Sequence, residues 1–196
     1  GANFDTRSDQ VPDERLNADV TVLCQNEIRP EAGFACLKRA KSLGAKTILN
    51  LAPAASVPED VLDVLDILVV NEIEAAMAAG LDELGKDAMP IALALSERHD
   101  LTMVITLGAN GAIAAGRSGH FRVSSLPIEP VDTTGAGDAF VGILAAAFDG
   151  GAELQEALKR ASVGAGLACT QIGAQTSQPL RAEIEARLDD VSVGKM

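Results

Sequence analysis

The 196-residue sequence contains no tryptophan or tyrosine, and aromatic residues make up only 3% of it. Alanine, valine, leucine and isoleucine must therefore build the core, and apolar residues at 47% are numerous enough for a substantial one. Basic residues are also few: the sequence has 16 Lys and Arg against 28 Asp and Glu, which gives a net charge of -12. Such a charge disfavours nucleic-acid backbones and anionic membranes, so we expect neither as a partner.

Cysteine is scarce, and its pattern excludes two classes of framework. Cys24, Cys36 and Cys169 are odd in number, widely spaced and without a CxxC motif. We therefore expect buried free thiols in a reduced, cytoplasmic protein rather than disulfides or a zinc site. The apolar runs are short and are broken by glycine or charge. The sequence thus predicts neither a signal peptide nor a membrane span.

Two common nucleotide-binding motifs are missing. No strand is followed by GxGxxG, a helix and a later acidic residue, which argues against a dinucleotide-binding dehydrogenase, and there is no Walker A motif. His99 and His120 have no partner at metal-ligand spacing, so we assign them no chemistry and expect surface or turn positions. The chain also begins with glycine rather than methionine, as though entered partway through a gene product.

What the sequence does contain is an alternation of strand-like and helix-like segments. Short apolar runs predict strands at 19–25, 47–51, 67–70 and 103–107, and a hairpin from 112–115 and 120–123. Helices are predicted at 30–43, 59–64, 72–79, 90–99, 137–147, 153–170 and about 181–188, with a polar connection at 81–88 and a polar tail. This order predicts one α/β structure, in which helices cover both faces of a parallel sheet.

The segment VDTTGAGDAF, residues 131–140, is a polar, glycine-rich turn that opens directly into a helix. Its glycines let successive N–H groups point into one small space, where the helix N-terminus adds partial positive charge. That arrangement suits a phosphate whose negative charge grows during transfer, with Asp138 beside it as a base. Alternatively, Asp138 only offsets the helix dipole in the first turn. Taken alone, the turn does not decide between the two.

Polar residues follow the predicted strands at the edge where α/β sheets bind ligands: Glu27, Asn50, Asn71 with Glu74, and 106–108. Asn71 and Glu74 are three residues apart at a helix start, so their side chains face one direction and suit water molecules around Mg²⁺. They equally suit a helix cap. The turn at 106–111 allows a planar or phosphate-bearing ligand close to the backbone, or is an ordinary hairpin turn.

These blocks resemble a known family. DTTGAGDAFVG (132–142) resembles the C-terminal signature of the PfkB carbohydrate kinases, the ribokinase-like superfamily, while VNEIEA (70–75) and TLGANG (106–111) resemble its NxxE region and nucleotide loop. NLAPA (50–54), GAQTSQP (173–179) and Gln25-Asn26-Glu27 point to the ribokinase branch. Leu51 and Thr176 depart from it where proline is usual, and Ser162 where histidine or asparagine is common. The implied fold is a ribokinase-like three-layer α/β/α sandwich with a mostly parallel sheet.

The resemblance implies ATP-dependent phosphorylation of the primary hydroxyl of a sugar, with ribose as the first candidate. Asp138 would act as general base, and Gly135, Ala136 and Gly137 would form the anion hole. Glu27 and Asp138 would bind the sugar. The implied nucleotide contacts are Asn71, Thr106, Leu107, Gly108, Ala109, Asn110, Gly111, Gly137, Asp138 and Ser162.

Two metal ions are implied by the same resemblance. Asn71 and Glu74 would hold Mg²⁺ through water as it accompanies ATP. An activating K⁺ would lie beside the anion hole, bound mostly through backbone carbonyls at Asp132, Thr134, Ala168, Gln171, Gly173 and Ser177.

Residues 1–196 are then the C-terminal, nucleotide-binding portion of a single ribokinase-like domain, because the N-terminal strands and the β lid of the family have no counterpart here. A fragment, a cleavage product and a truncated gene all fit this expectation. Family members often pair through the lid, so we do not expect a homodimer of this chain. Two alternatives stay open: a catalytically inactive nucleotide-binding fragment, and a kinase for fructose, a nucleoside or another ribokinase-like substrate.

Overall fold

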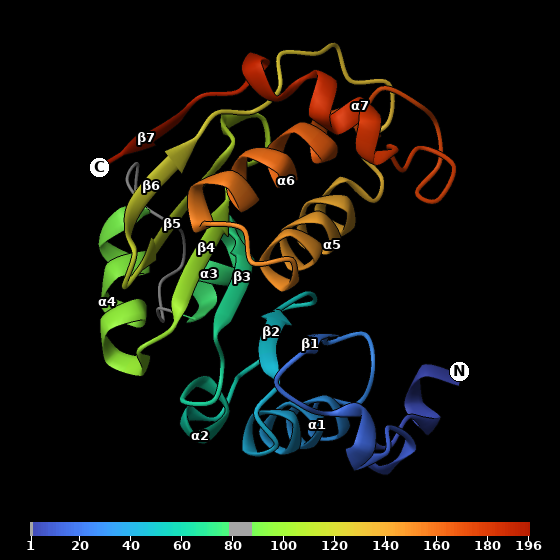
Figure 1. The fold of residues 1–196 in the computed structure, drawn as a ribbon, viewed down its shortest axis with the longest axis vertical. Coiled ribbons are helices and arrows are strands. Elements are labelled where there is room, and N and C mark those ends of the chain that lie inside the picture. Colours follow the sequence, from blue (N-terminus) through green and yellow to red (C-terminus); the bar gives the residue numbers. More distant parts are fainter. Residues whose placement is uncertain (1, 79–87) are drawn as a thin grey trace. The chain divides into compact units, whose positions relative to one another are not determined.

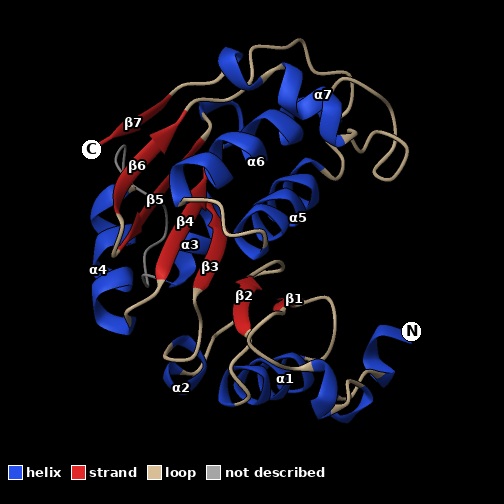
Figure 2. Ribbon diagram, viewed as in Figure 1, coloured by secondary structure: helices blue, strands red, loops and turns tan. Residues whose placement is uncertain are grey.

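The computed structural model describes residues 2–78 and 88–196 (Figure 1). They form two compact units, Gly1–Ile105 with Ala114–Arg117, and Thr106–Ile113 with Ser118–Met196. The predicted polar connection at 81–88 lies outside the described residues apart from Ala88. Helices and strands alternate along most of the chain (Figure 2), and the α/β class predicted from the sequence is confirmed.

The first unit is built on parallel strands. Its elements are β1 (Thr21–Gln25), α1 (Pro30–Ser42), β2 (Lys46–Asn50), α2 (Glu59–Leu62), β3 (Ile67–Asn71), α3 (Glu72–Ala78), α4 (Met89–His99) and most of β4 (Thr102–Thr106). β1 pairs with β2 and β2 with β3, both in parallel, so that Leu23 lies opposite Ile48 and Ile48 opposite Ile67. The parallel pairing predicted for these strands is therefore confirmed, and α1 packs against β1 and β2.

The second unit contains η4 (Gly108–Asn110), β6 (Gly119–Val123), α5 (Ala136–Asp149), α6 (Leu154–Ala168), α7 (Arg181–Ala186), η5 (Leu188–Asp190) and β7 (Val193–Lys195), while β5 (Ala112–Gly116) spans the division. The orange helix α6 in Figure 1 contacts α5, α7, β6 and β7. The sequence predicted a polar tail where β7 pairs antiparallel with β6, Phe121 opposite Lys195. The strands follow chain order across the sheet, β1-β2-β3-β4-β5-β6-β7.

Three short 3-10 helices precede β1: η1 (Ala2–Asp5), η2 (Ser8–Gln10) and η3 (Asp13–Arg15). None of their residues is buried. Instead, two arginines hold the segment by its backbone, since Arg29 donates to the Thr6 carbonyl at 3.1 Å and Arg39 to the Ser8 carbonyl at 2.6 Å. No element is predicted here from the sequence, because these partners are 23 and 31 residues away.

The core is aliphatic, as the composition predicts. Among the twelve largest fully buried side chains that the structure describes, Phe121 alone is aromatic, and the strands supply Ile48, Leu49, Ile67 and Leu68. This packing leaves few polar groups inside. Within the described residues, no helix is both long and apolar enough to cross a bilayer.

Two expectations about single residues are corrected. His99 is not a surface residue: it ends α4 at 7% exposure, and its Nδ1 lies 2.8 Å from the Asp63 carboxylate. His120 lies within the strand β6, not in a turn, and is partly exposed. The three cysteines are free, as predicted, but only Cys36 is buried, while Cys24 and Cys169 are partly exposed.

Candidate functional site

The residues that the sequence predicts for the site are divided between the two units. Glu27, Asn71 and Glu74 belong to the first unit, and the predicted residues from Thr106 to Ser177 belong to the second. Within each unit, local hydrogen bonds fix their positions.

In the first unit, Asn71 and Glu74 cap the start of α3 reciprocally. The Glu74 N–H donates to Asn71 Oδ1 at 2.9 Å, and the Asn71 N–H donates to Glu74 Oε2 at 2.7 Å. Glu74 is only 6% exposed, and this burial raises the pKa of its carboxyl against the opposing effect of the Asn71 bond. Asn71 and Glu74 therefore do act as a helix cap for α3. Glu74 Oε1 accepts no hydrogen bond from a described residue, so it fits a water molecule on Mg²⁺.

The segment after β1 is anchored by Asn26. Its N–H donates to the Ala52 carbonyl at 3.0 Å and its side-chain amide to the Pro53 carbonyl at 3.1 Å. Asn26 is 9% exposed, whereas its neighbour Glu27 is exposed. No described residue bonds the Glu27 carboxylate, which leaves it available for a ligand hydroxyl.

In the second unit, the signature turn bends sharply into α5. Gly135 is the N-cap in the left-handed region, with φ 78° and ψ 3°, where only glycine fits without strain. The Ala136 N–H donates to the Thr133 carbonyl at 3.2 Å, and the Ala139 N–H to the Gly135 carbonyl at 2.8 Å. The N–H groups of Gly135 and Gly137 donate to no described residue. Two of the three N–H groups expected to form the anion hole therefore have no acceptor among the described residues.

Asp132 ties this turn to a second loop. One carboxylate oxygen accepts the Thr134 N–H at 2.9 Å, and the other accepts the Gly173 N–H at 3.0 Å. Hydrogen bonds from Thr134, through its side chain first, and from the Gly173 backbone lower the pKa of Asp132 from 3.8 to about 2. The carboxylate therefore stays ionised and joins the signature turn to residues 172–177.

The loop at 172–177 also packs against the turn directly. A Cβ atom added to Gly135 would lie 3.0 Å from the Ala174 Cβ. In the same loop, the Ser177 Oγ is buried and has no hydrogen-bond partner among the described residues, with the whole residue at 3% exposure. A buried hydroxyl without a partner is costly unless something else binds it. Because K⁺ takes neutral oxygen ligands, this hydroxyl fits the monovalent cation that the family resemblance implies.

The predicted nucleotide loop is a single 3-10 turn. The Leu107 N–H donates to the Gly111 carbonyl at 2.8 Å, and the Gly111 N–H to the Gly108 carbonyl at 3.1 Å. The Ser125 hydroxyl donates a hydrogen bond to the Ala109 carbonyl at 2.6 Å. These bonds close the loop on itself and fasten it to the segment after β6.

Ser162 of α6 is bonded to the same segment. It is 5% exposed, and its hydroxyl donates to the Ser124 carbonyl at 2.6 Å. The Ser162 hydroxyl therefore donates its hydrogen bond within the protein rather than to a ligand. Sequence reasoning missed Ser124 and Ser125, because two serines in a connecting segment carry no distinctive pattern.

A cavity of about 450 Å³ opens beside this loop, and that volume is within the range of small-molecule sites. It is lined by Ala109, Asn110, Arg122, Ser124, Ser125, Ser192 and Gly194. Of these, only Ala109 and Asn110 were predicted. Arg122 is an exposed residue of β6. The alternation of buried and exposed residues along a strand was the sequence signal that could have placed its side chain on the surface.

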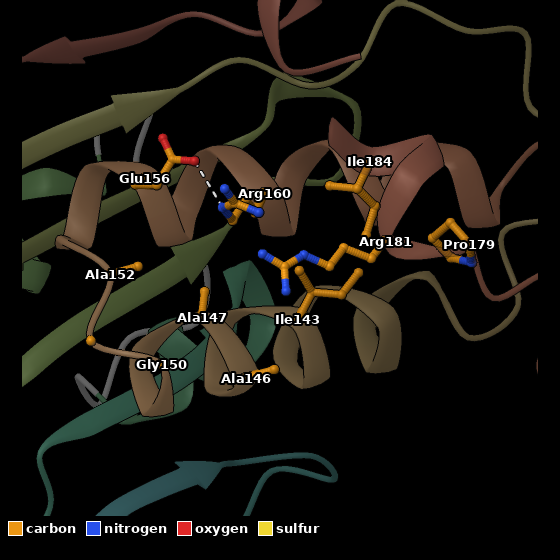
Figure 3. Close-up of a pocket in the computed structure, with 11 residues that line it drawn as sticks. Ile143, Ala146, Ala147, Gly150, Ala152, Glu156, Arg160, Pro179, Arg181 and Ile184 are labelled. Atoms are coloured by element: carbon orange, nitrogen blue, oxygen red, sulfur yellow. Dashed lines mark hydrogen bonds and ion pairs between the residues drawn. The ribbon is translucent and has the colours of Figure 1, made fainter. Parts of the chain in front are cut away.

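A larger cavity of about 590 Å³ lies between α5, α6 and α7 and contains none of the predicted residues (Figure 3). Arg160 of α6 lines it, donating to Glu156 of the same helix at 2.8 Å and also to Glu185 of α7. Arg181 also pairs with Glu185, at 3.3 Å. The two guanidinium charges are thus matched by two carboxylates, and this cavity offers no net charge for a phosphate.

The low pKa of Asp132 predicts how stability depends on pH. A carboxyl whose pKa is lowered on folding stabilises the fold above its ordinary value, and this contribution is lost as the pH falls through the folded value. We expect Asp132→Asn to lower the melting temperature at pH 6, and the gap to wild type to close between pH 3.8 and about 2. Thermal unfolding followed by circular dichroism across this range measures it.

The matched control is Asp5→Asn, since Asp5 is exposed and its carboxyl makes no bond to a described residue. That variant should melt like wild type at every pH. A gap for Asp132→Asn that stays constant from pH 6 to pH 2 would contradict the role given to this carboxylate.

Comparison with known proteins places these features in a family. Residues 5–181 match the pfkB family carbohydrate kinase. The chain is 36% identical to the ribokinase of Bacillus subtilis over 175 residues, which cover 89% of this chain and 57% of that protein. The Thermotoga maritima ribokinase structure matches with a TM-score of 0.85 at 29% identity, covering 96% of this chain and 63% of that one.

A further match is the structure of Arabidopsis thaliana ribokinase complexed with ribose and ATP. It has a TM-score of 0.78 at 29% identity and covers 86% of this chain and 55% of that one. The chain thus spans a little over half the length of these relatives. The family match covers most of its residues, and the ribokinase branch predicted from the sequence is supported by relatives and structures alike. The chain belongs to the pfkB family of carbohydrate kinases.

Proposed function

We propose that the protein transfers the γ-phosphoryl group of ATP to the primary hydroxyl of a sugar, with ribose as the first candidate. The observation that carries this proposal is the signature turn. It presents Asp138 in the first turn of α5 beside the unengaged N–H groups of Gly135 and Gly137, and Asp132 holds it in place. The ribokinase relatives support the sugar and the nucleotide.

In this proposal Asp138 accepts the proton of the attacking hydroxyl as general base. The Gly135 and Gly137 N–H groups, with the partial positive charge at the N-terminus of α5, stabilise negative charge that grows on the transferring phosphoryl. The Ala136 N–H joins them if it leaves the Thr133 carbonyl, to which it donates at 3.2 Å. Positioning and electrostatics thus supply most of the catalysis, as phosphoryl transfer requires.

The nucleotide is assigned to Asn71, Thr106, Leu107, Gly108, Ala109, Asn110, Gly111 and Ser162, with Gly137 and Asp138 next to its γ-phosphate. The cavity beside Ala109 and Asn110 supports this assignment. Asn71 and Glu74 would hold Mg²⁺ through water, and bound Mg²⁺ neutralises charge on the phosphates.

We assign an activating K⁺ to Asp132, Thr134, Ala168, Gln171, Gly173 and Ser177. The buried Ser177 hydroxyl without a described partner supports this site. On the sugar side, Glu27 would accept a hydroxyl hydrogen bond, since it is exposed and unbonded by described residues.

The wider context belongs to the same proposal. Residues 1–196 form the C-terminal, nucleotide-binding portion of a ribokinase-like domain, the protein works in the reducing cytoplasm, and this chain does not form the family's homodimer. A second candidate function is nucleotide binding without catalysis. It is favoured by one observation, that the chain covers only 57% of a full-length relative.

An assay over a small sugar panel separates these candidates. The 196-residue chain is incubated with ATP and Mg²⁺ and with ribose, deoxyribose, fructose or a nucleoside, in K⁺ or Na⁺, and ADP release is measured alongside ATP binding by calorimetry. We expect ribose-dependent ADP release that is faster in K⁺. ATP binding without turnover on any sugar would support the second candidate. Absence of ATP binding would overturn both.

A further inference from the structure

Two of the three cysteines lie on elements that pack together. Cys24 is in β1, and Cys36 is in α1, which packs against β1. Gly33 and Cys36 are one turn apart on one face of α1. A Cβ atom at Gly33 would lie 4.0 Å from the Cys24 Cβ, so this face of the helix meets Cys24.

The sulfur of Cys24 reaches the level of Cys36. It lies 3.9 Å from the Gly33 carbonyl oxygen, as a weak thiol donor. Carbonyls in an α-helix point toward its C-terminus, so the oxygen of Gly33 points toward the turn that carries Cys36. The two thiols are therefore near enough for each to shift the pKa of the other.

The two sulfurs have different chemistry. The neighbouring Cys24 thiol and the charge of Arg39 lower the pKa of the Cys36 thiol to about 6. The pKa of Cys24 is raised by the neighbouring Cys36 and by partial burial, which disfavours the thiolate. Cys36 is therefore the nucleophile at neutral pH, and Cys24 is the thiol that then attacks the oxidised Cys36 sulfur. Because Cys36 is only 8% exposed, a reagent must be small to reach it.

We propose that Cys24 and Cys36 are a redox-active pair that hydrogen peroxide converts to a reversible intrachain disulfide. The Cys36 thiolate attacks one peroxide oxygen, the O–O bond breaks, and the leaving hydroxide takes a proton to become water. Cys36 is then a sulfenic acid. The Cys24 sulfur attacks the Cys36 sulfur, the S–O bond breaks, and the hydroxide leaves as water with the Cys24 proton. Two thiols are oxidised and one peroxide is reduced to two waters.

The pair lies next to the segment assigned to the sugar. Cys24 is followed by Gln25, Asn26 and Glu27, and Asn26 holds that segment to the loop at Ala52 and Pro53. A disulfide from Cys24 to Cys36 of α1 would restrain this segment at its N-terminal end as well. This part of the inference rests on the proposed function: the oxidised enzyme should show a several-fold higher KM for the sugar with an unchanged KM for ATP.

The disulfide itself is tested without any activity. The reduced chain is treated with hydrogen peroxide, and we expect the intact mass to fall by two hydrogen atoms. The loss should be confined to the tryptic peptide 16–38, which carries both Cys24 and Cys36 because trypsin does not cleave the Arg29–Pro30 bond. Dithiothreitol should reverse the loss. Below pH 6 the reaction should slow, because the Cys36 thiolate is then lost. Cys169 supplies the control, since Cys169→Ser should react as wild type does.

Single variants separate the two roles. In Cys24→Ser we expect no linked product, and the Cys36 sulfenic acid should be trapped by dimedone. Cys36→Ser should give neither product. Circular dichroism establishes that each variant is folded. A wild-type chain that forms no Cys24–Cys36 link, or that is oxidised first at Cys169, would overturn the proposal. A link formed in a chain without kinase activity would leave the redox pair standing and reject only the proposed function.

Discussion

Asp138→Asn is expected to reduce kcat of the active kinase by at least about 100-fold, with nearly unchanged affinity for ATP. The amide has almost the shape of the carboxylate but cannot accept the proton of the attacking hydroxyl. Asp138 lies in the first turn of α5, beyond the left-handed Gly135, so the substitution leaves the turn's backbone in place. Losing a charge at a helix N-terminus costs only about 0.5 kcal/mol of stability, so folding should survive.

The measurement combines steady-state turnover with ATP binding by calorimetry. Glu129→Gln is the matched control, because it removes an exposed carboxylate from the segment just before the turn. That variant should keep wild-type kcat. If Asp138→Asn kept most of its turnover, Asp138 would be a residue that offsets the helix dipole and nothing more.

Gly111→Ala is expected to destabilise the fold by about 3 kcal/mol or more. Gly111 ends the nucleotide loop with φ 83° and ψ -131°, a region that residues with a side chain avoid. An added Cβ would also lie 2.8 Å from the carbonyl carbon of Ser124 and nearer still to the carbonyl oxygen of Val123. These are backbone atoms, so the loop and the segment after β6 must move apart.

Gly108→Ala is the control from the same loop. Gly108 also has a positive φ, 54°, but nothing lies within 4 Å of an added Cβ, so only the conformational cost of about 1 kcal/mol remains. Urea unfolding of both variants gives the difference. The Gly111 variant should also bind ATP more weakly, because its loop is displaced. Equal destabilisation by the two substitutions would contradict the close backbone approach at Gly111.

Local patterns predicted most of the fold. Pure apolar runs such as the one around Ile48 mark buried strands, and Pro30 marks the start of α1. β7 was missed because VGK is short, contains glycine and has no apolar alternation, so only its pairing with β6 makes it a strand. The burial of His99 was missed for a similar reason, since its partner Asp63 is 36 residues away in the sequence.

The candidate site rests on residue type and spacing, whereas the hydrogen bonds that hold its residues could not be predicted from the sequence. The sequence offered a cap or a metal site at Asn71 and Glu74, and the structure shows the reciprocal cap with one carboxylate oxygen left over. Nothing in the sequence connects Asp132 with Gly173, which is 41 residues further on. Such links depend on tertiary packing, which local pattern does not encode.

That link has a thermodynamic consequence. Because the Asp132 carboxylate holds Thr134 and Gly173 at once, the turn and the loop at 172–177 are already ordered before any phosphate arrives. A binding site assembled in advance loses little chain entropy when its ligand enters. Calorimetry on wild type and Asp132→Asn should therefore show a more unfavourable binding entropy for nucleotide in the variant, since there the ligand itself must order the two segments.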